Sequence, residues 1–203
     1  MSAWVTDVLG SDYQARTLPL ADDDEGEVVA TLVRHRPASD EPTRPARAVL
    51  YLHGWNDYFF QTGLAEFWHA QGAAFYALDL RKYGRSLRPH QTPNYVDDLA
   101  VYDEDLDAAV AQIRKDLGRR ARIMLMGHST GGLVGTLWAH RNPGSVTGLV
   151  LNSPWLEITG ASFTRNISMP LVQQLARQRP KSPLITIDPG FYARSLLAEQ
   201  GGE

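Results

Sequence analysis

Short apolar runs alternate with longer amphipathic stretches through the middle of the chain. The apolar runs are residues 46–52, 73–79, 122–126 and 146–151. Runs of this length without polar alternation are typical of strands that are buried on both faces of a sheet. The amphipathic stretches are residues 59–71, 95–117 and 130–140. Because strands and helices alternate, we predict an α/β protein with a mostly parallel sheet and helices on both faces.

The stretch 95–117 shows the helical pattern most clearly. Its apolar residues recur at intervals of three, four or one and form a single stripe, which is expected to face the sheet. Its many acidic residues are predicted to form a solvated face on the opposite side.

Residues 13–20 and 27–36 are predicted to be two further strands, joined by the polar turn 21–26. The turn is strongly acidic, and an acidic loop can bind calcium. The ligand spacing of an EF-hand is missing, however. We therefore predict a hairpin with a solvated turn.

The pattern changes after residue 154. Residues 155–203 carry scattered apolar residues and several prolines, with one predicted helix at 170–178 and a weak strand candidate at 184–187. Pro170 suits the first turn of that helix. We therefore divide the chain into a core, residues 1–154, and a second region, residues 155–203.

The composition of the chain argues against several kinds of partner, site and location. The chain has 203 residues and a net charge of −3, which gives no reason to expect nucleic acid or an anionic membrane as a partner. It has no cysteine, so disulfides and thiolate metal sites are excluded. Its first residues lack the pattern of a signal peptide, and no apolar run approaches the ~20 residues of a membrane span. We therefore expect a cytoplasmic protein without a stable membrane anchor.

The sequence Gly-His-Ser-Thr-Gly, from Gly127 to Gly131, follows an apolar run and opens a helical stretch. A G-x-S-x-G motif between a strand and a helix is the pattern of a nucleophile elbow. Such a turn holds the serine at its apex in a strained conformation, and the two glycines let strand and helix pack closely. Ser129 is thus the predicted nucleophile. A simpler role for Ser129, capping the helix that follows, is compatible with this prediction.

Two other stretches extend the pattern. They are residues 52–58, Leu-His-Gly-Trp-Asn-Asp-Tyr, and residues 79–86, Asp-Leu-Arg-Lys-Tyr-Gly-Arg-Ser. Together with residues 127–132 they resemble the H-G loop, the D-x-R-x-x-G-x-S loop and the elbow of the α/β-hydrolase superfamily. The resemblance is to its serine aminopeptidase-like branch, which includes monoacylglycerol lipases and lysophospholipases. Order and spacing agree over residues 12–155, and residues 155–203 would correspond to the start of the variable cap.

The resemblance implies roles for individual residues. The backbone N–H groups of Trp55 and Thr130 would stabilise the oxyanion that forms during acyl transfer. Trp55 and Trp155 would contact an apolar substrate, although simple core packing is an alternative role for Trp55. The remaining motif residues would be structural: His53, Gly54, Gly127, His128 and Gly131.

Two features of these loops allow more than one interpretation. His53 ends a buried strand and could be taken for a catalytic base, but the resemblance implies a structural position that is hydrogen-bonded near the elbow. Arg81 and Arg85 could bind a carboxylate or phosphate group of a ligand. We favour instead that they pair with carboxylates and brace their own loop.

The histidine of a catalytic triad is not found in the expected order. The superfamily orders its triad as serine, acid and histidine, and only His140 follows Ser129. The helix would separate the two by about 16 Å along its axis, which excludes proton transfer. His128, next to Ser129, is expected to point elsewhere. Three histidines lie upstream, outside the family's order: His35, His69 and His90, of which His90 is the best substitute.

The acid is missing as well. Glu157 and Asp188 are the nearest candidates, and we favour neither. The resemblance implies that acid and base lie beyond Glu203, so we expect a fold truncated after the sixth strand and part of the cap. The run 146–151 would then be an exposed sheet edge, and we predict a chain that is poorly soluble, self-associates as a dimer through that edge, or is partly molten.

These expectations define two functions from different classes. The first is a serine hydrolase that cleaves a small lipophilic ester, such as a monoacylglycerol or a lysophospholipid, through an acyl-enzyme on Ser129. The alternative is a non-catalytic ligand-binding module or an inactive fragment on the same fold. A nucleotide-binding protein is disfavoured, because the glycine-rich phosphate-binding motifs are absent. No metal or organic cofactor is implied, and the sequence leaves substrate identity and oligomeric state open.

Overall fold

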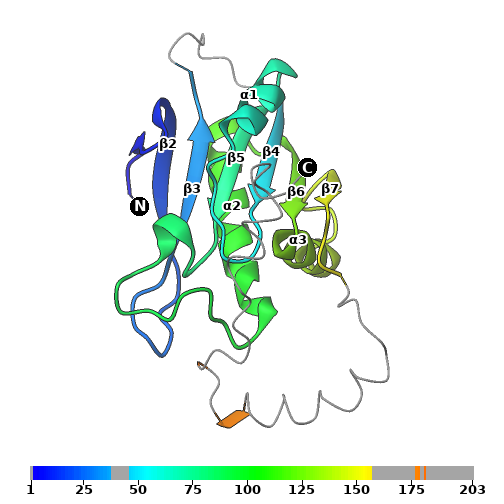
Figure 1. The fold of residues 1–203 in the computed structure, drawn as a ribbon. Helices are drawn as coiled ribbons and strands as arrows, with labels where there is room; N and C mark the ends of the chain where they lie inside the picture. Colours follow the sequence, from blue (N-terminus) through cyan, green and yellow to red (C-terminus); the bar gives the residue numbers. More distant parts are fainter. Residues whose placement is uncertain (1, 38–45, 157–176, 179–180, 182–203) are drawn as a thin grey trace, which may run out of the picture. The chain divides into compact units, whose positions relative to one another are not determined.

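The computed structural model describes residues 2–37, 46–156, 177–178 and 181 (Figure 1). The chain divides into two compact units, Met1–Ile158 and Thr159–Glu203. Several predictions lie outside the described residues: the candidate acids Glu157 and Asp188, the strand 184–187 and all but the last two residues of the helix 170–178.

Seven described strands form one mixed sheet in the order β1-β2-β3-β5-β4-β6-β7. They are β1 (Val5–Asp7), β2 (Gly10–Pro19), β3 (Val29–His35), β4 (Arg47–Leu52), β5 (Ala74–Asp79), β6 (Arg122–His128) and β7 (Gly148–Asn152). All except β1 and β3 run in one direction, which confirms the mostly parallel sheet. The short strand β1 was not predicted from the sequence.

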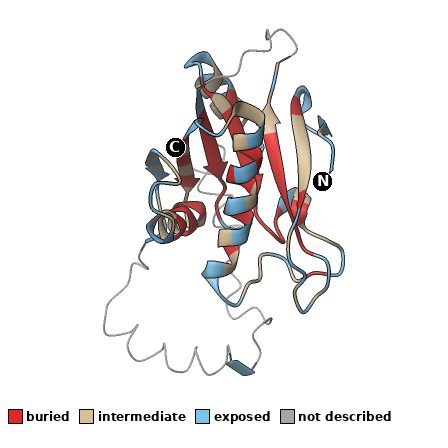
Figure 2. Cartoon of the chain, turned by 180° about the vertical axis from the view of Figure 1, so that it is seen from behind, coloured by how far each residue is buried: buried red, intermediate tan, exposed pale blue. Residues whose placement is uncertain are grey.

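Helices cover both faces of this sheet, as predicted. Leu50 of β4 faces α2 (Tyr102–Leu117) and α3 (Thr130–Arg141) and shares a core cluster with their side chains. The next residue, Tyr51, belongs to the cluster under α1 (Thr62–Ala70). This alternation follows from the two-residue period of a strand. Figure 2 shows the result, with buried central strands behind the exposed outer face of α2.

Two helices begin later than the sequence pattern predicts. The first begins at Thr62 rather than Phe59, because the Phe59 N–H donates instead to Asp79 Oδ1 at 2.9 Å. The second begins at Tyr102 after a short 3-10 turn, Leu99–Val101. That turn is capped by Asp98, whose side chain accepts a hydrogen bond from the backbone of Ala100. In both places an acidic side chain satisfies a backbone N–H and moves the start of the helix.

Two predictions about acidic residues are confirmed only in part, because particular carboxylates form ion pairs instead of facing solvent. The turn between β2 and β3 is not simply solvated: the Lys82 ammonium lies 2.6 Å from Asp23 Oδ2 and 2.6 Å from Glu25 Oε2. The Lys82 ammonium thus occupies the position between these carboxylates that a calcium ion would need. On α2, Asp105 is completely buried and pairs with Arg81 rather than facing solvent. Long-range ion pairs, which the local pattern does not encode, decide both cases.

Candidate active site

The turn between β6 and α3 has the strained geometry that its motif predicts. Ser129 has φ 50° and ψ −118°, a conformation that L-residues rarely adopt. A Cβ added to Gly127 would lie 2.7 Å from Gly132 Cα, and one added to Gly131 would overlap the His53 carbonyl oxygen. Glycine is therefore required at both positions for the strand, the helix and the neighbouring loop to approach this closely.

The Ser129 side chain does not cap the helix. It occupies the N-cap position of α3, but its hydroxyl makes no capping hydrogen bond. The compatible second role suggested by the sequence is therefore not used by the side chain. The Ser129 hydroxyl is therefore not engaged in a hydrogen bond to the end of the helix.

The loop after β4 passes directly beside this serine. A Cβ added to Gly54 would lie 3.3 Å from Ser129 Cβ and 3.2 Å from His128 Cδ2. Glycine at this position thus lets the loop lie against the elbow. Trp55 follows and is 52% exposed, so the alternative of core packing is wrong for this residue.

The two predicted oxyanion donors come from these neighbouring segments. In the described part of the chain, the Trp55 N–H donates no hydrogen bond. Thr130 is the first residue of α3, and the first N–H groups of a helix have no partner within that helix. Both groups therefore remain able to serve a ligand beside Ser129.

His53 uses both of its ring nitrogens in the framework. Its Nε2 accepts from the Leu80 N–H at 3.2 Å, so Nδ1 carries the proton and donates to the Gly54 carbonyl at 2.8 Å. Burial lowers the pKa of His53 below its ordinary value, although the nearby Asp79 carboxylate opposes that shift. A neutral imidazole whose two ring nitrogens are both hydrogen-bonded has no free lone pair with which to accept the Ser129 proton. The ring instead fixes the two loops relative to each other.

The basic residues after β5 also belong to the framework, which confirms the interpretation favoured from the sequence. Arg85 pairs with Asp7 at 2.7 Å and with Asp79 at 2.9 Å. Asp79 additionally accepts from the Phe59 N–H, so this pair ties the loop after β4 to the loop after β5. Arg81 is neutralised by Asp105 on α2 at 2.7 Å. Neither guanidinium is therefore left to bind an anionic ligand.

The segment after β7 wraps around the same serine. The Ser129 N–H donates to the Asn152 carbonyl at 3.1 Å, and the Trp155 N–H donates to the Ser129 carbonyl at 2.9 Å. Pro154 packs on Gly132 so closely that a Cβ there would lie 2.8 Å from Pro154 Cβ. Trp155 and Leu156 are 45% and 56% exposed. The roles of Asn152 and Leu156 were not anticipated, because only their position after a strand end marks them in the sequence.

No described histidine is hydrogen-bonded to Ser129. His128 lies against Gly54, and its Nδ1 is buried without a hydrogen-bond partner. His140 is in the last turn of α3, and His90 lies 3.8 Å from the position of a Cβ on Gly26, in the turn before β3. The rings of His35 and His69 pack against each other at 5.1 Å. None of the described histidines is therefore placed to act as the general base for Ser129.

The described residues give no evidence for a metal or a membrane span. They contain no cluster of three or more His, Asp or Glu side chains that could hold a metal ion. None of their helices has both the length and the apolar character that crossing a bilayer requires.

Comparison with known proteins gives both a family and several similar folds. The pattern of the family described as serine aminopeptidase, S33, matches residues 43–195. Phospholipase YtpA of Bacillus subtilis is 32% identical over 117 residues, which cover 56% of this chain and 42% of that protein. The chain thus spans about two fifths of the length of this curated relative.

Two solved structures illustrate the similarity in fold. A carboxyl esterase from Bacillus coagulans superposes with a TM-score of 0.62 at 14% identity, covering 92% of this chain and 57% of that one. The hypothetical protein PA2218 from Pseudomonas aeruginosa gives a TM-score of 0.63 at 17% identity, covering 96% and 66%. Identities this low establish a shared fold and no shared activity.

Proposed function

Because this chain belongs to the serine aminopeptidase S33 family and has the α/β-hydrolase fold, we propose that it forms the nucleophile-bearing part of a serine hydrolase for lipophilic carboxylic esters. The observation that carries the proposal is Ser129, held at φ 50° between β6 and α3 with no capping role for its hydroxyl. The combination of φ 50° with ψ −118° lies outside the left-handed region that L-residues can adopt, costs about 1–3 kcal/mol and is not expected in a purely structural turn.

The proposed reaction is acyl transfer. Ser129 Oγ attacks the ester carbonyl carbon and loses its proton to a general base, while the carbonyl oxygen becomes an oxyanion. The N–H groups of Trp55 and Thr130 donate to that oxyanion, and losing one such donor costs about 3 kcal/mol of transition-state stabilisation. The tetrahedral intermediate releases the alcohol and leaves an acyl-enzyme, which water hydrolyses. The described residues supply the nucleophile and the oxyanion donors. None of them is identified as the general base.

The proposed substrate is a small lipophilic ester, such as a monoacylglycerol or a lysophospholipid. Trp55 follows Gly54, which lies against Ser129, and the Trp155 backbone is hydrogen-bonded to Ser129. The two tryptophans are 52% and 45% exposed. Exposed aromatic side chains beside a nucleophile suit an acyl chain. The nearby guanidiniums of Arg81 and Arg85 are already paired, so recognition through a charged group is not favoured. The similarity to a bacterial phospholipase supports the same class.

A second candidate function is ligand binding without catalysis. The specific observation in its favour is that no described histidine reaches Ser129. On this alternative the aromatic residues around Ser129 would hold an apolar ligand and no acyl-enzyme would form. We also propose that residues 1–154 form the hydrolase core and that residues 155–203 begin its cap.

The deciding experiment measures p-nitrophenyl butyrate hydrolysis by the purified chain, by Ser129→Ala and by Ser153→Ala. Ser153 is a matched control, because it is exposed, has φ 46° and follows the neighbouring strand β7. The proposal predicts turnover that Ser129→Ala abolishes and Ser153→Ala retains, with a covalent adduct on Ser129 after fluorophosphonate treatment. Equal rates in the chain and in Ser129→Ala, with no adduct, would favour the binding function.

A further inference from the structure

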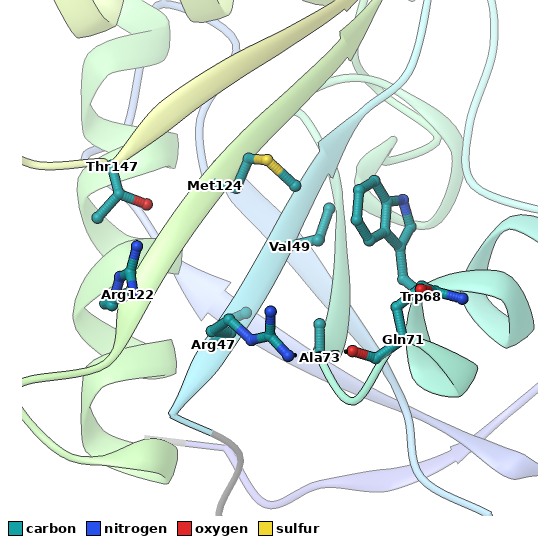
Figure 3. A pocket seen from close by; sticks show the side chains of 9 residues that line it. Arg47, Val49, Trp68, Gln71, Ala73, Arg122, Met124 and Thr147 are labelled. Carbon is teal, nitrogen blue, oxygen red and sulfur yellow. Dashed lines mark hydrogen bonds between the residues drawn. The ribbon is translucent and has the colours of Figure 1, made fainter.

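A pocket of about 190 Å³ lies at the amino-terminal ends of β4 and β6 (Figure 3). Arg47 is the first residue of β4, and Arg122 is the first residue of β6. Ser129 follows the other end of β6, seven residues further along the strand. At about 3.3 Å per residue the pocket is roughly 20 Å from the candidate nucleophile. It is therefore a separate site.

Two exposed arginines line this pocket from adjacent strands. Arg47 and Arg122 are register partners on adjacent parallel strands, so their side chains leave the same face of the sheet. Like charges on neighbouring strands repel each other. The pocket lining contains no Asp or Glu, and in the described part of the chain Arg122 has no ion-pair partner. Arg47 donates to a neutral acceptor, the Gln71 carbonyl, at 3.2 Å. Figure 3 shows the Arg47 guanidinium turned towards Gln71 and away from Arg122, so a carboxylate bound by both arginines would draw the two exposed side chains together.

The remaining walls of the pocket are largely apolar. Val49, Trp68 and Met124 line it, and Figure 3 shows the Trp68 indole on the same side of the sheet as the other two side chains. A cavity of about 150 Å³ with apolar walls is large enough to hold benzene. The pocket of about 190 Å³ therefore has room for one ring together with a carboxylate.

We propose that this pocket binds a small monocarboxylate whose apolar body has about the size of one aromatic ring. Its carboxylate lies between Arg47 and Arg122, and its ring lies against Trp68 and Met124. The forked donors of a guanidinium match a carboxylate, and such charge-assisted hydrogen bonds are among the strongest in proteins. The site does not depend on the function proposed for Ser129.

The test titrates the chain with benzoate at constant ionic strength and follows the Trp68 indole N–H resonance by NMR. Trp68→Phe assigns this resonance among the five tryptophans of the chain. Benzamide, which has the same shape without the charge, and inorganic phosphate, which has charge without the ring, are the comparison ligands. Arg122→Met removes one guanidinium, and Arg120→Met, also exposed but outside the pocket lining, is the matched control.

The proposal predicts a saturable shift with a Kd of about 1 mM or below for benzoate. Arg122→Met should weaken binding by about tenfold, the effect of losing a hydrogen bond to a charged group, and Arg120→Met should not change it. Four results would each overturn the proposal. They are the absence of a saturable shift, equal binding of benzamide, phosphate binding as tight as benzoate, and benzoate binding that is unaffected by Arg122→Met.

Discussion

The backbone N–H of Trp155 donates to the carbonyl oxygen of Ser129 at 2.9 Å. This hydrogen bond fixes the segment after β7 on the turn that follows β6. It places the Trp155 backbone at the serine, while Gly54, which precedes Trp55 in the loop after β4, lies against the Ser129 side chain. Three chain segments that are far apart in sequence therefore meet at one residue.

The elbow should not tolerate a side chain at Gly131. A Cβ there overlaps the His53 carbonyl oxygen and lies against the Leu52 carbonyl group, and these backbone atoms cannot move aside as a flexible side chain could. Gly131→Ala should lower the free energy of unfolding by about 3 kcal/mol, the usual upper range for overpacking. Urea denaturation followed by circular dichroism measures this. In the control, Gly63→Ala, nothing lies within 4 Å of the new Cβ in helix α1, so stability should rise slightly. Similar behaviour of the two variants would contradict the packing argument.

The buried ion pair between Arg81 and Asp105 should be essential to the fold. Asp105 is completely buried, and its carboxylate accepts from the Arg81 backbone N–H and Nε, each at 2.7 Å. Asp105→Ala leaves a buried guanidinium without its main partner and should cost about 3–5 kcal/mol of unfolding free energy. Chemical denaturation at pH 7.5 is the measurement. Asp103→Ala, which breaks the more exposed pair with Arg141, should cost far less. An equal loss in both variants would show that burial is not the cause.

His53 should make the fold sensitive to mild acid. Its pKa is lowered in the folded chain by burial, so below the ordinary value of 6.5 the unfolded chain binds a proton that the folded chain does not. Stability from this group is therefore present above pH 6.5 and is lost as the pH falls below it, by about 1.4 kcal/mol per pH unit. His53→Gln keeps an acceptor for the Leu80 N–H but does not titrate. Its unfolding free energy should fall less steeply between pH 6.5 and 5.5.

Asp105 titrates in an overlapping range, because burial raises its pKa to about 6, against the opposing charge of Arg81. Its contribution has the opposite sign: the folded chain holds this proton more tightly, so stability falls as the pH rises towards 6. Asp105 is present both in the chain and in His53→Gln. Its contribution therefore cancels when the pH dependence of the unfolding free energy is compared between the two proteins. Parallel pH profiles for the chain and His53→Gln would show that His53 is not the acid-sensitive group.

Trp55 and Trp155 should distinguish long from short acyl chains if Ser129 acts as proposed. Removing either indole should lower kcat/KM for p-nitrophenyl octanoate by about tenfold, since roughly two buried methylene groups would lose their contact. The acetate ester is too short to reach the indoles and should be little affected. Phe67→Ala is the control, because Phe67 is 54% exposed on α1, away from the loops that meet at Ser129. An equal loss for both esters would contradict an acyl-binding role.

The outer edge of β7 should promote self-association. Within the described residues β7 pairs only with β6, and its Leu149 and Leu151 are 39% and 38% exposed. The strand carries no charge or proline that would protect a sheet edge. Sedimentation velocity should show concentration-dependent dimers that Leu151→Lys weakens. The control Leu156→Lys places the same charge outside the strand. A chain that is monomeric at every concentration would contradict the proposal.

The sequence by itself determined six of the seven described strands, their order along the chain and the turn that carries Ser129. These features are local: a buried strand is a continuous apolar run, and the elbow needs glycines within a few residues of the serine. The predicted ranges for β4, β5 and α3 therefore agree with the observed bounds to within one residue. The family resemblance rested on the same local motifs, and the match over residues 43–195 confirms it.

Only the tertiary structure decided which residues far apart in sequence meet. Lys82 could have paired with any acidic residue, and the packing of the sheet selected Asp23 and Glu25. Asp79 delayed the start of α1 by accepting the Phe59 N–H, an effect that helical periodicity cannot reveal. The pairing of Arg47 with Arg122 likewise exists only because β4 and β6 are neighbours in the sheet. Such contacts depend on strand order and register, which arise from the burial of the whole core and are not written in any one segment.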